Sequence, residues 1–207
     1  MDDDVAPCTA LAYLDPSYWD QRFEKEEHYE WLKDFSHFRH LLTPLLSPSI
    51  SVLEVGCGNS RLGEEILREG VSGGVTCIDL SPVAVHRMHD RLVEQGTSGV
   101  DVVVADMLDM PFESDSFDLV IEKGTMDALC VDIGDPWNPN PTTVDNVMKM
   151  LEATLPSTIF RGPWVYMVCR VEHIWHRLPL FLLHPPEGNE VTRVQSSPRY
   201  VTCSSKH

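Results

Sequence analysis

The sequence predicts an α/β fold built on a doubly wound, mostly parallel sheet, and three observations lead to this prediction. Short β-branched runs alternate with helical patterns between residues 50 and 155. Glycines or acidic residues stand at the ends of successive predicted strands. The length of 207 residues suits a single domain of this class. Strands that alternate with helices form a parallel sheet, because each crossover returns the chain to the same end of the sheet.

The predicted elements follow one another from Ile50 onward. The strands are short apolar runs rich in β-branched residues and bounded by glycine or carboxylate side chains. Ser81 followed by Pro82 is a typical helix start, with Ser81 as the N-cap. The expected strands are residues 51–55, 74–79, 100–105 and 116–122, and the expected helices are residues 61–69, 82–94 and 143–155.

Composition divides the chain into three segments. Residues 1–15 are expected to form a loose acidic lead, residues 16–160 the α/β domain, and residues 161–207 an atypical, partly disordered tail. Residues 16–46 alternate aromatic and charged side chains. The spacing in the second part of this stretch predicts an amphipathic helix that ends near Pro44.

The charge balance bears on the partners of this chain. Its 32 acidic and 16 basic side chains give a formal net charge of −16. Such a charge repels nucleic-acid phosphates and anionic lipids and attracts basic proteins, although acidity also serves solubility alone. We therefore expect a protein partner, no nucleic acid or membrane, and a monomer.

Other compositional features concern the compartment. No apolar run approaches the length of a membrane span, and the acidic N-terminus lacks the apolar core of a signal peptide. The six cysteines are scattered, without a CxxC pair or zinc-ligand spacing. These features predict a reducing, cytoplasmic location and no metal site.

A glycine turn, Gly56-Cys57-Gly58, follows the first predicted strand. Glycines let the backbone turn tightly and approach a ligand closely. Glu54 precedes the turn, where a carboxylate can hold it and act near a cofactor amino group. A dinucleotide fingerprint would need a third glycine, and Arg61 occupies that position. The turn therefore favours S-adenosylmethionine (SAM), which has no pyrophosphate to seat on the helix, over NAD.

Carboxylates end the next two predicted strands. Asp79 is placed where an acidic side chain accepts both hydroxyls of a ribose. Asp106 is placed to accept the exocyclic amine of adenine, and Met107 offers an apolar flank and a backbone N–H. Either aspartate alone also suits a simple turn or helix entry. Together with the glycine turn they indicate a nucleoside site, because ligands of such sheets bind at this edge.

Longer stretches of the sequence resemble a known family. Residues 54–60, 79–81 and 117–129 are similar to eukaryotic methyltransferases that modify lysines of translation elongation factor 1-alpha. Residues 18–23 and 29–31 fit the same family, and the likeness covers about residues 16–155. The resemblance implies a Rossmann-like class I methyltransferase fold and SAM-dependent transfer to a protein lysine, with elongation factor 1-alpha as the candidate substrate.

The resemblance also implies roles for individual residues. Simple packing of the N-terminal segment would equally explain its aromatic residues, and Glu122 with Lys123 would equally suit a surface ion pair. The residues expected to hold SAM are Trp19, Phe23 and Trp31 as a cover, Glu54, Gly56 and Gly58 at the turn, Asp79 and Leu80 at the ribose, Asp106 and Met107 at the adenine, and Lys123 at the methionine part.

Methyl transfer to lysine has simple chemical requirements. Donor and acceptor must be aligned in line, and the attacking amine must be neutral. Loss of the ammonium proton is helped by desolvation or by a nearby carboxylate. Glu122 and Asp127, near the end of the fourth predicted strand, are the candidate catalytic residues.

The sequence departs from the family pattern after Leu155. We do not find the family's fifth strand or its antiparallel end, although residues 163–171 are expected to replace the fifth strand in part. In a frame shifted by one base, permitted codons for residues 166–188 encode a sequence similar to the family's C-terminal strands. We hypothesise a frame-shifted or alternatively spliced product with an incomplete sheet, low stability and weak SAM binding. An uninterrupted frame in the genomic exons would reject this hypothesis.

Two alternative functions remain open at this point. One is a non-catalytic binding or regulatory relative that keeps the cofactor pocket but not the activity. The other is a nucleotide-dependent oxidoreductase, which the missing third glycine disfavours. A methyl-transfer assay separates the first from an enzyme, and thermal shifts with SAM and NADH test the second.

Overall fold

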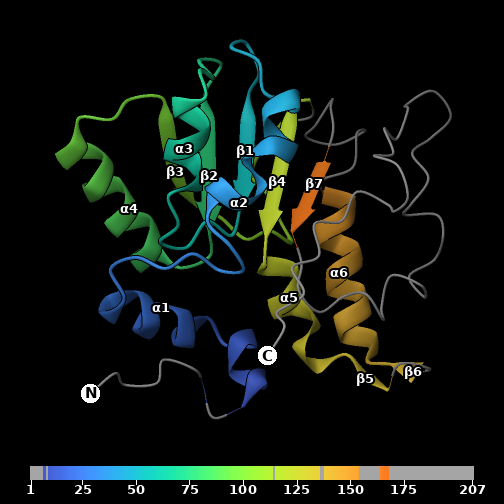
Figure 1. The fold of residues 1–207 in the computed structure, drawn as a ribbon. Helices are drawn as coiled ribbons and strands as arrows, with labels where there is room; N and C mark the ends of the chain where they lie inside the picture. Colours follow the sequence, from blue (N-terminus) through green and yellow to red (C-terminus); the bar gives the residue numbers. More distant parts are fainter. Residues whose placement is uncertain (1–6, 8, 114, 136–137, 154–163, 168–207) are drawn as a thin grey trace, which may run out of the picture.

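A five-stranded sheet with helices on both faces forms the centre of the molecule (Figure 1). The computed structural model describes residue 7 and residues 9–113, 115–135, 138–153 and 164–167. All five strands are parallel and lie in the order β3-β2-β1-β4-β7. The predicted fold class is therefore confirmed. The strands are β1 (Val52–Val55), β2 (Val75–Asp79), β3 (Val100–Val104), β4 (Leu119–Lys123) and β7 (Trp164–Met167).

The order in which successive strands are added to the sheet reverses at β1. This strand pairs with β2 on one side and β4 on the other, so that Val52 lies opposite both Val75 and Leu119. The carboxyl ends of these parallel strands meet at one edge of the sheet. The crevice outside such a switch point is where ligands bind in open α/β sheets.

Side chains that alternate along the strands build two hydrophobic cores, one on each face of the sheet. Leu53 and Val55 enter the core that α5 and α6 complete. Val52 enters the opposite core, which α2, α3 and α4 complete. These helices are α2 (Phe35–Leu42), α3 (Leu62–Arg68), α4 (Pro82–Gln95), α5 (Thr125–Leu129) and α6 (Pro141–Ala153), and a short 3-10 helix, η2 (Thr43–Leu45), follows α2.

Helix α4 begins as the sequence predicts. The Ser81 hydroxyl oxygen accepts the Ala84 N–H at 3.2 Å, and Pro82 occupies the first helical position. The helix ends at Gly96, whose φ of +63° places it in the left-handed region. The other predicted helices are also present, with bounds that differ by one or two residues from those expected.

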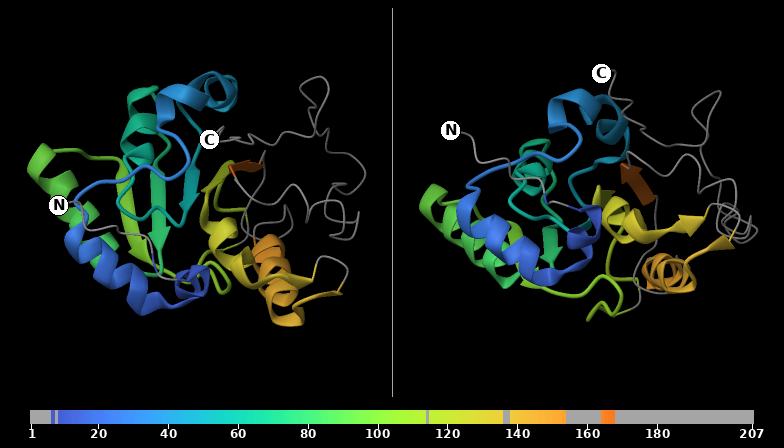
Figure 2. Two further views of the ribbon diagram at one scale, coloured as in Figure 1. Left: turned by 60° about the horizontal axis from the view of Figure 1, so that its bottom comes forward. Right: turned by 90° about the horizontal axis from the view of Figure 1, so that it is seen from below.

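The N-terminal helices η1 (Ala10–Leu14) and α1 (Pro16–Lys25) lie across the carboxyl ends of the strands (Figure 1). The view from below shows α1 beside α4 (Figure 2). Helix η1 contacts α5 and the 3-10 helix η3 (Cys130–Asp132). Residues 10–14 were expected in a loose lead. They are ordered instead, because the Trp19 indole donates to the Tyr13 carbonyl at 2.9 Å and the two rings stack.

The fifth strand, β7, extends the sheet beyond β4. Trp164 lies opposite Val120 in parallel register, so the expected partial replacement of this strand by residues 163–171 is confirmed for residues 164–167. A separate two-stranded sheet joins β5 (Gly134–Asp135) to β6 (Asn138–Pro139). Residues 154–163 and 168–207, and with them the rest of the predicted atypical tail at residues 161–207, lie outside the described residues. Within the described residues, no helix is long and apolar enough to cross a membrane.

Candidate functional site

A cavity of about 530 Å³ lies at the carboxyl edge of the sheet, a size typical of small-molecule sites. The ends of β1 to β4 and the N-terminal segment together form its wall. The structure brings every predicted cofactor-binding residue into this wall, and Asp127 with them. These residues are Trp19, Phe23, Trp31, Glu54, Gly56, Gly58, Asp79, Leu80, Asp106, Met107 and Lys123.

The turn after β1 depends on glycine at two positions. Gly56 and Gly58 have φ values of +68° and +52°, in the region that side chains with a Cβ rarely adopt. A Cβ on Gly56 would collide with the side chain of Thr125, whose hydroxyl donates to the Val55 carbonyl at 3.1 Å. A Cβ on Gly58 would come within 3.0 Å of the Phe23 ring. The backbone can therefore approach a ligand closely here.

Asp79 joins the glycine turn to the start of α4. One carboxylate oxygen accepts the Gly58 N–H at 2.8 Å and the other accepts the Ser81 N–H at 2.8 Å. Each oxygen keeps acceptor capacity beyond these bonds. Burial raises the pKa of this carboxyl above its ordinary value. A side chain fixed in this way at the cavity wall can accept the two hydroxyls of a ribose.

The end of β3 provides the next part of the wall. The Asp106 carboxylate accepts the Leu108 N–H at 2.8 Å, which fixes the turn that follows the strand. Met107 is half-buried, while Leu80 is exposed on the neighbouring turn. An acidic acceptor between apolar side chains matches the amine edge and the faces of adenine.

An aromatic cover closes the cavity from the N-terminal side. The Trp19 ring stacks on Phe23 with centroids 5.8 Å apart and meets the edge of Trp31 at 5.8 Å. The Arg22 guanidinium lies 4.7 Å from the Trp31 ring centroid, a cation–π contact. The Trp31 indole nitrogen is buried and has no hydrogen-bond partner within the described part of the chain. A ligand with an acceptor group would satisfy this donor.

Lys123 ends β4 with a buried ammonium. Its Nζ donates to the Glu30 carboxylate and to the Trp31 carbonyl, both at 3.0 Å. Glu30 was not among the predicted site residues. Its position in the aromatic segment at residues 29–31 was noticed, but the sequence carries no signal that it reaches a strand end 93 positions away.

Glu54 lies below the turn and is 2% exposed. Its carboxylate accepts a hydrogen bond from the Cys77 thiol at 3.3 Å. Burial raises its pKa to about 7, while the positive charge of Lys123 acts in the opposite direction. This carboxyl therefore titrates near neutral pH at the floor of the cavity.

The two candidate catalytic residues have different surroundings. Asp127 of α5 lines the cavity and is half-buried. Glu122 is fully buried and does not line the cavity. Its carboxylate accepts the Met126 N–H at 2.8 Å, so it supports the start of α5. The reason is the alternation of side chains along β4, which places Glu122 and Lys123 on opposite faces of the sheet.

A polar clamp that the sequence did not reveal holds the glycine turn from α4. The Arg91 guanidinium donates to the carbonyls of Asn59 and Ser60 at 3.1 and 2.7 Å and pairs with Glu64 at 2.9 Å. The Asn59 side chain in turn accepts the Tyr29 N–H at 3.1 Å. These contacts join residues about 30 positions apart in the chain, which sequence spacing cannot show.

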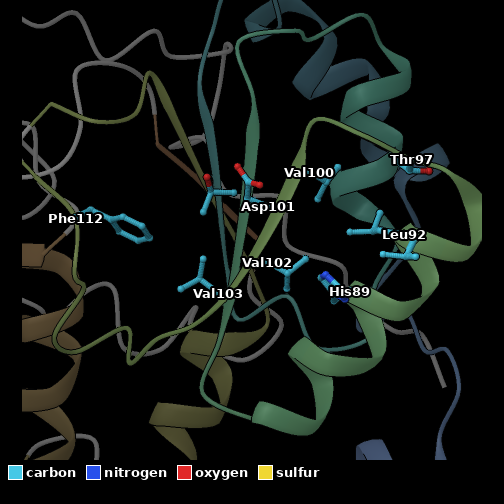
Figure 3. Close-up of a pocket in the computed structure, with 10 residues that line it drawn as sticks. His89, Leu92, Thr97, Val100, Asp101, Val102, Val103 and Phe112 are labelled. Carbon is cyan, nitrogen blue, oxygen red and sulfur yellow. The ribbon is translucent and has the colours of Figure 1, made fainter.

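A second hollow lies at the outer edge of β3 (Figure 3). Phe112 lies on one side of this strand, and Leu92, His89 and Thr97 lie on the other (Figure 3). The labelled side chains do not converge on a common point. Across the described residues there is no cluster of histidine, cysteine, aspartate and glutamate that could hold a metal ion.

Comparison with known proteins gives a consistent result. Residues 52–133 match the "Methyltransferase domain" family. The chain is 37% identical over 164 residues to EEF1A lysine methyltransferase 4 of Mus musculus, covering 78% of this chain and 63% of that protein. It is 31% identical over 131 residues to the eEF1A lysine and N-terminal methyltransferase of Xenopus laevis, covering 62% of this chain and 19% of that protein.

Among solved structures, the PH0226 protein from Pyrococcus horikoshii OT3 shares the fold. The TM-score is 0.51 at 17% identity, covering 82% of this chain and 68% of that chain. Residues 52–133 are thus similar to a methyltransferase domain, and a parallel sheet with a cavity at its switch point is the arrangement of the class I, SAM-dependent methyltransferases. In sequence, the chain is similar to EEF1A lysine methyltransferases of two mammals. The chain spans 63% of the length of EEF1A lysine methyltransferase 4.

Proposed function

We propose that this chain transfers a methyl group from SAM to a lysine side chain of translation elongation factor 1-alpha. The observation that carries the proposal is the cavity wall, which contains a ribose-type carboxylate, an adenine-type acceptor and a buried ammonium. The names of the similar proteins support lysine as the acceptor and elongation factor 1-alpha as the substrate.

Each part of the wall suits one part of SAM. Asp79 would accept the ribose hydroxyls, while Asp106 with Met107 and Leu80 would enclose the adenine. Gly56 and Gly58 would let the backbone pass close to the cofactor, and Glu54 would lie beneath its amino group. Trp31 and Lys123 would donate to the carboxylate of the methionine part. Trp19 and Phe23 would cover the cofactor.

The bound cofactor would supply an electrophilic methyl group on a sulfonium. The residues of the chain would align the acceptor amine with it and keep water away. Asp127, which lines the cavity, would accept the proton that the lysine ammonium must lose before its nitrogen attacks. As the carbon–nitrogen bond forms, the carbon–sulfur bond of the cofactor would break, and its electron pair would stay on sulfur. Glu122, which lies outside the wall, would support α5 instead of reacting.

The setting of this reaction is also part of the proposal. The net charge of −16 supports a basic protein substrate over nucleic acid or an anionic membrane. We infer that the chain acts as a monomer in the cytoplasm.

Methyl transfer from radiolabelled SAM to purified elongation factor 1-alpha tests the proposal. Asp127→Asn should lower the rate by about 10²- to 10⁴-fold, the range for loss of a general base. Asp101→Asn, on the exposed part of β3, is the matched control and should leave the rate unchanged. Cofactor binding without transfer by the wild-type chain would instead support the non-catalytic binding protein. Equal rates for the wild type and Asp127→Asn would reject the role of Asp127.

A further inference from the structure

The Glu30 carboxylate connects three separate parts of the cavity wall. One oxygen accepts the Arg61 N–H at 2.7 Å, and the Ser60 hydroxyl lies within 3.1 Å of both oxygens. The other oxygen accepts from the Lys123 ammonium at 3.0 Å. Glu30 thereby joins the aromatic N-terminal segment to the glycine turn and to the end of β4. The Glu30 side chain is itself outside the residues that line the cavity.

This arrangement fixes the direction of the Lys123 ammonium. A lysine ammonium has three donors, and here Glu30 and the Trp31 carbonyl occupy two of them. The Lys123 side chain is 5% exposed, so it has little freedom to turn. Lys123 and Trp31 both line the cavity. The ammonium that Glu30 orients therefore lies at the wall where a ligand would bind.

We propose that Glu30 is a positioning residue for the amino-acid end of the cofactor. It holds Lys123 and the Trp31 segment so that the third ammonium proton meets the cofactor's carboxylate. Glu30 acts through Lys123 and does not touch the cofactor, because its side chain lies outside the residues that line the cavity. The inference rests on the proposed function in that SAM occupies this cavity.

The role can be separated from simple support of the fold by the choice of ligand. S-adenosylhomocysteine carries the amino-acid end. 5′-Methylthioadenosine has the same nucleoside and thioether without it. A collapse of the cavity wall would weaken the binding of both ligands equally. Loss of an oriented ammonium would weaken the binding of S-adenosylhomocysteine alone, because charge-assisted hydrogen bonds to its carboxylate are lost.

Calorimetric titration of both ligands into the full chain tests this inference. Glu30→Gln should lower the affinity for S-adenosylhomocysteine by about tenfold or more. The affinity for 5′-methylthioadenosine should stay within about twofold of the wild-type value. Glu27→Gln is the matched control, since Glu27 is exposed three residues earlier. In a Lys123→Gln background, Glu30→Gln should have no further effect on the ratio of the two affinities.

The contrary outcomes are distinct. Equal weakening of both ligands would assign Glu30 to the fold alone, and unchanged binding of S-adenosylhomocysteine would reject the role. Glu30→Asp keeps the charge but shortens the reach, so it should give the same selective loss and serves if Glu30→Gln does not fold. A folded wild-type chain that binds neither ligand would overturn the proposed function and this inference together. A chain that binds both without transferring methyl groups leaves the inference testable and rejects catalysis.

Discussion

At the scale of single residues, the cavity depends on positions where one chemical group cannot be replaced. Gly56 is such a position because of its φ of +68° and the side chain of Thr125 beside it. Asp79 is another, because both of its oxygens accept backbone N–H groups. A residue can be essential to a site through the space that it leaves as well as through the groups that it carries.

Substitution of Gly56 provides a test of the turn. Gly56→Ala should abolish binding of S-adenosylhomocysteine, because the new Cβ displaces Thr125 and distorts the turn. Gly70→Ala is a matched control, since Gly70 also has a positive φ, +95°, but no atom near its missing Cβ. The control should cost about 1 to 2 kcal/mol in unfolding free energy and retain binding. Retained binding in Gly56→Ala would contradict the description of this turn.

The buried Glu122 carboxyl predicts a pH dependence of stability. Burial raises its pKa from 4.5 to about 8, so the folded chain retains a proton that the unfolded chain releases. Its contribution to stability is present below pH 4.5 and is lost as the pH rises toward 8. Glu122→Gln cannot ionise, so its urea midpoint should fall less between pH 5 and pH 9 than that of the wild type.

The exposed Glu27→Gln variant controls for the removal of a carboxylate as such. The urea midpoint of this variant should change with pH as that of the wild type does, apart from the effect of one fewer carboxylate charge. Glu54, whose pKa burial raises to about 7, contributes in the same direction and is present in all three chains. An identical pH dependence in Glu122→Gln and the wild type would show that this carboxyl is ionised in the folded chain.

At the scale of elements, the sequence predicts well those helices and strands that local sequence patterns determine. The strand at Val75–Asp79 and the helix after Ser81 lie close to their predicted bounds because β-branched runs, an N-cap and a proline specify them locally. The 3-10 helix at Ala10–Leu14 was missed, because stacking of Tyr13 on Trp19 stabilises it and local propensity does not.

The same distinction applies to the site. The carboxyl-edge residues could be predicted, because each follows its own strand. Glu30 and Arg91 could not, because each acts through contacts with residues remote in the sequence. Glu122 was predicted to be catalytic because it lies near the end of the fourth predicted strand. The alternation along β4 is what separates it from Lys123 and from the cavity.

The start of α4 allows a test at this scale. Ser81→Ala and Ser81→Gly both remove the hydrogen bond that the Ser81 hydroxyl donates to Asp20 of α1. Both also leave the N–H of Ala84 without its acceptor. Loss of the cap costs about 1 kcal/mol with alanine but only a few tenths of a kcal/mol with glycine, so Ser81→Ala should have the lower free energy of unfolding. Equal urea midpoints for the two variants would indicate that the cap contributes nothing.

At the scale of the whole molecule, one parallel sheet forms the wall of the cavity. Strands β1 to β4 and their helices form its carboxyl edge, and β7 adds a fifth parallel strand beside β4. The mouse relative is longer, and this chain spans 63% of it. Our hypothesis of a frame-shifted C-terminus, with its expected low stability and weak SAM binding, concerns residues that lie mostly beyond the described part and stays a prediction.

We expect the cavity at the switch point of the sheet to bind SAM through Asp79. Calorimetric titration of S-adenosylhomocysteine into the wild-type chain, Asp79→Ala and the control Asp101→Ala tests this expectation. The wild type and the control should each bind one ligand per chain. Asp79→Ala should bind at least about tenfold more weakly, since two hydrogen bonds to a charged acceptor disappear. No binding by the folded wild type, or equal affinities for all three chains, would contradict it.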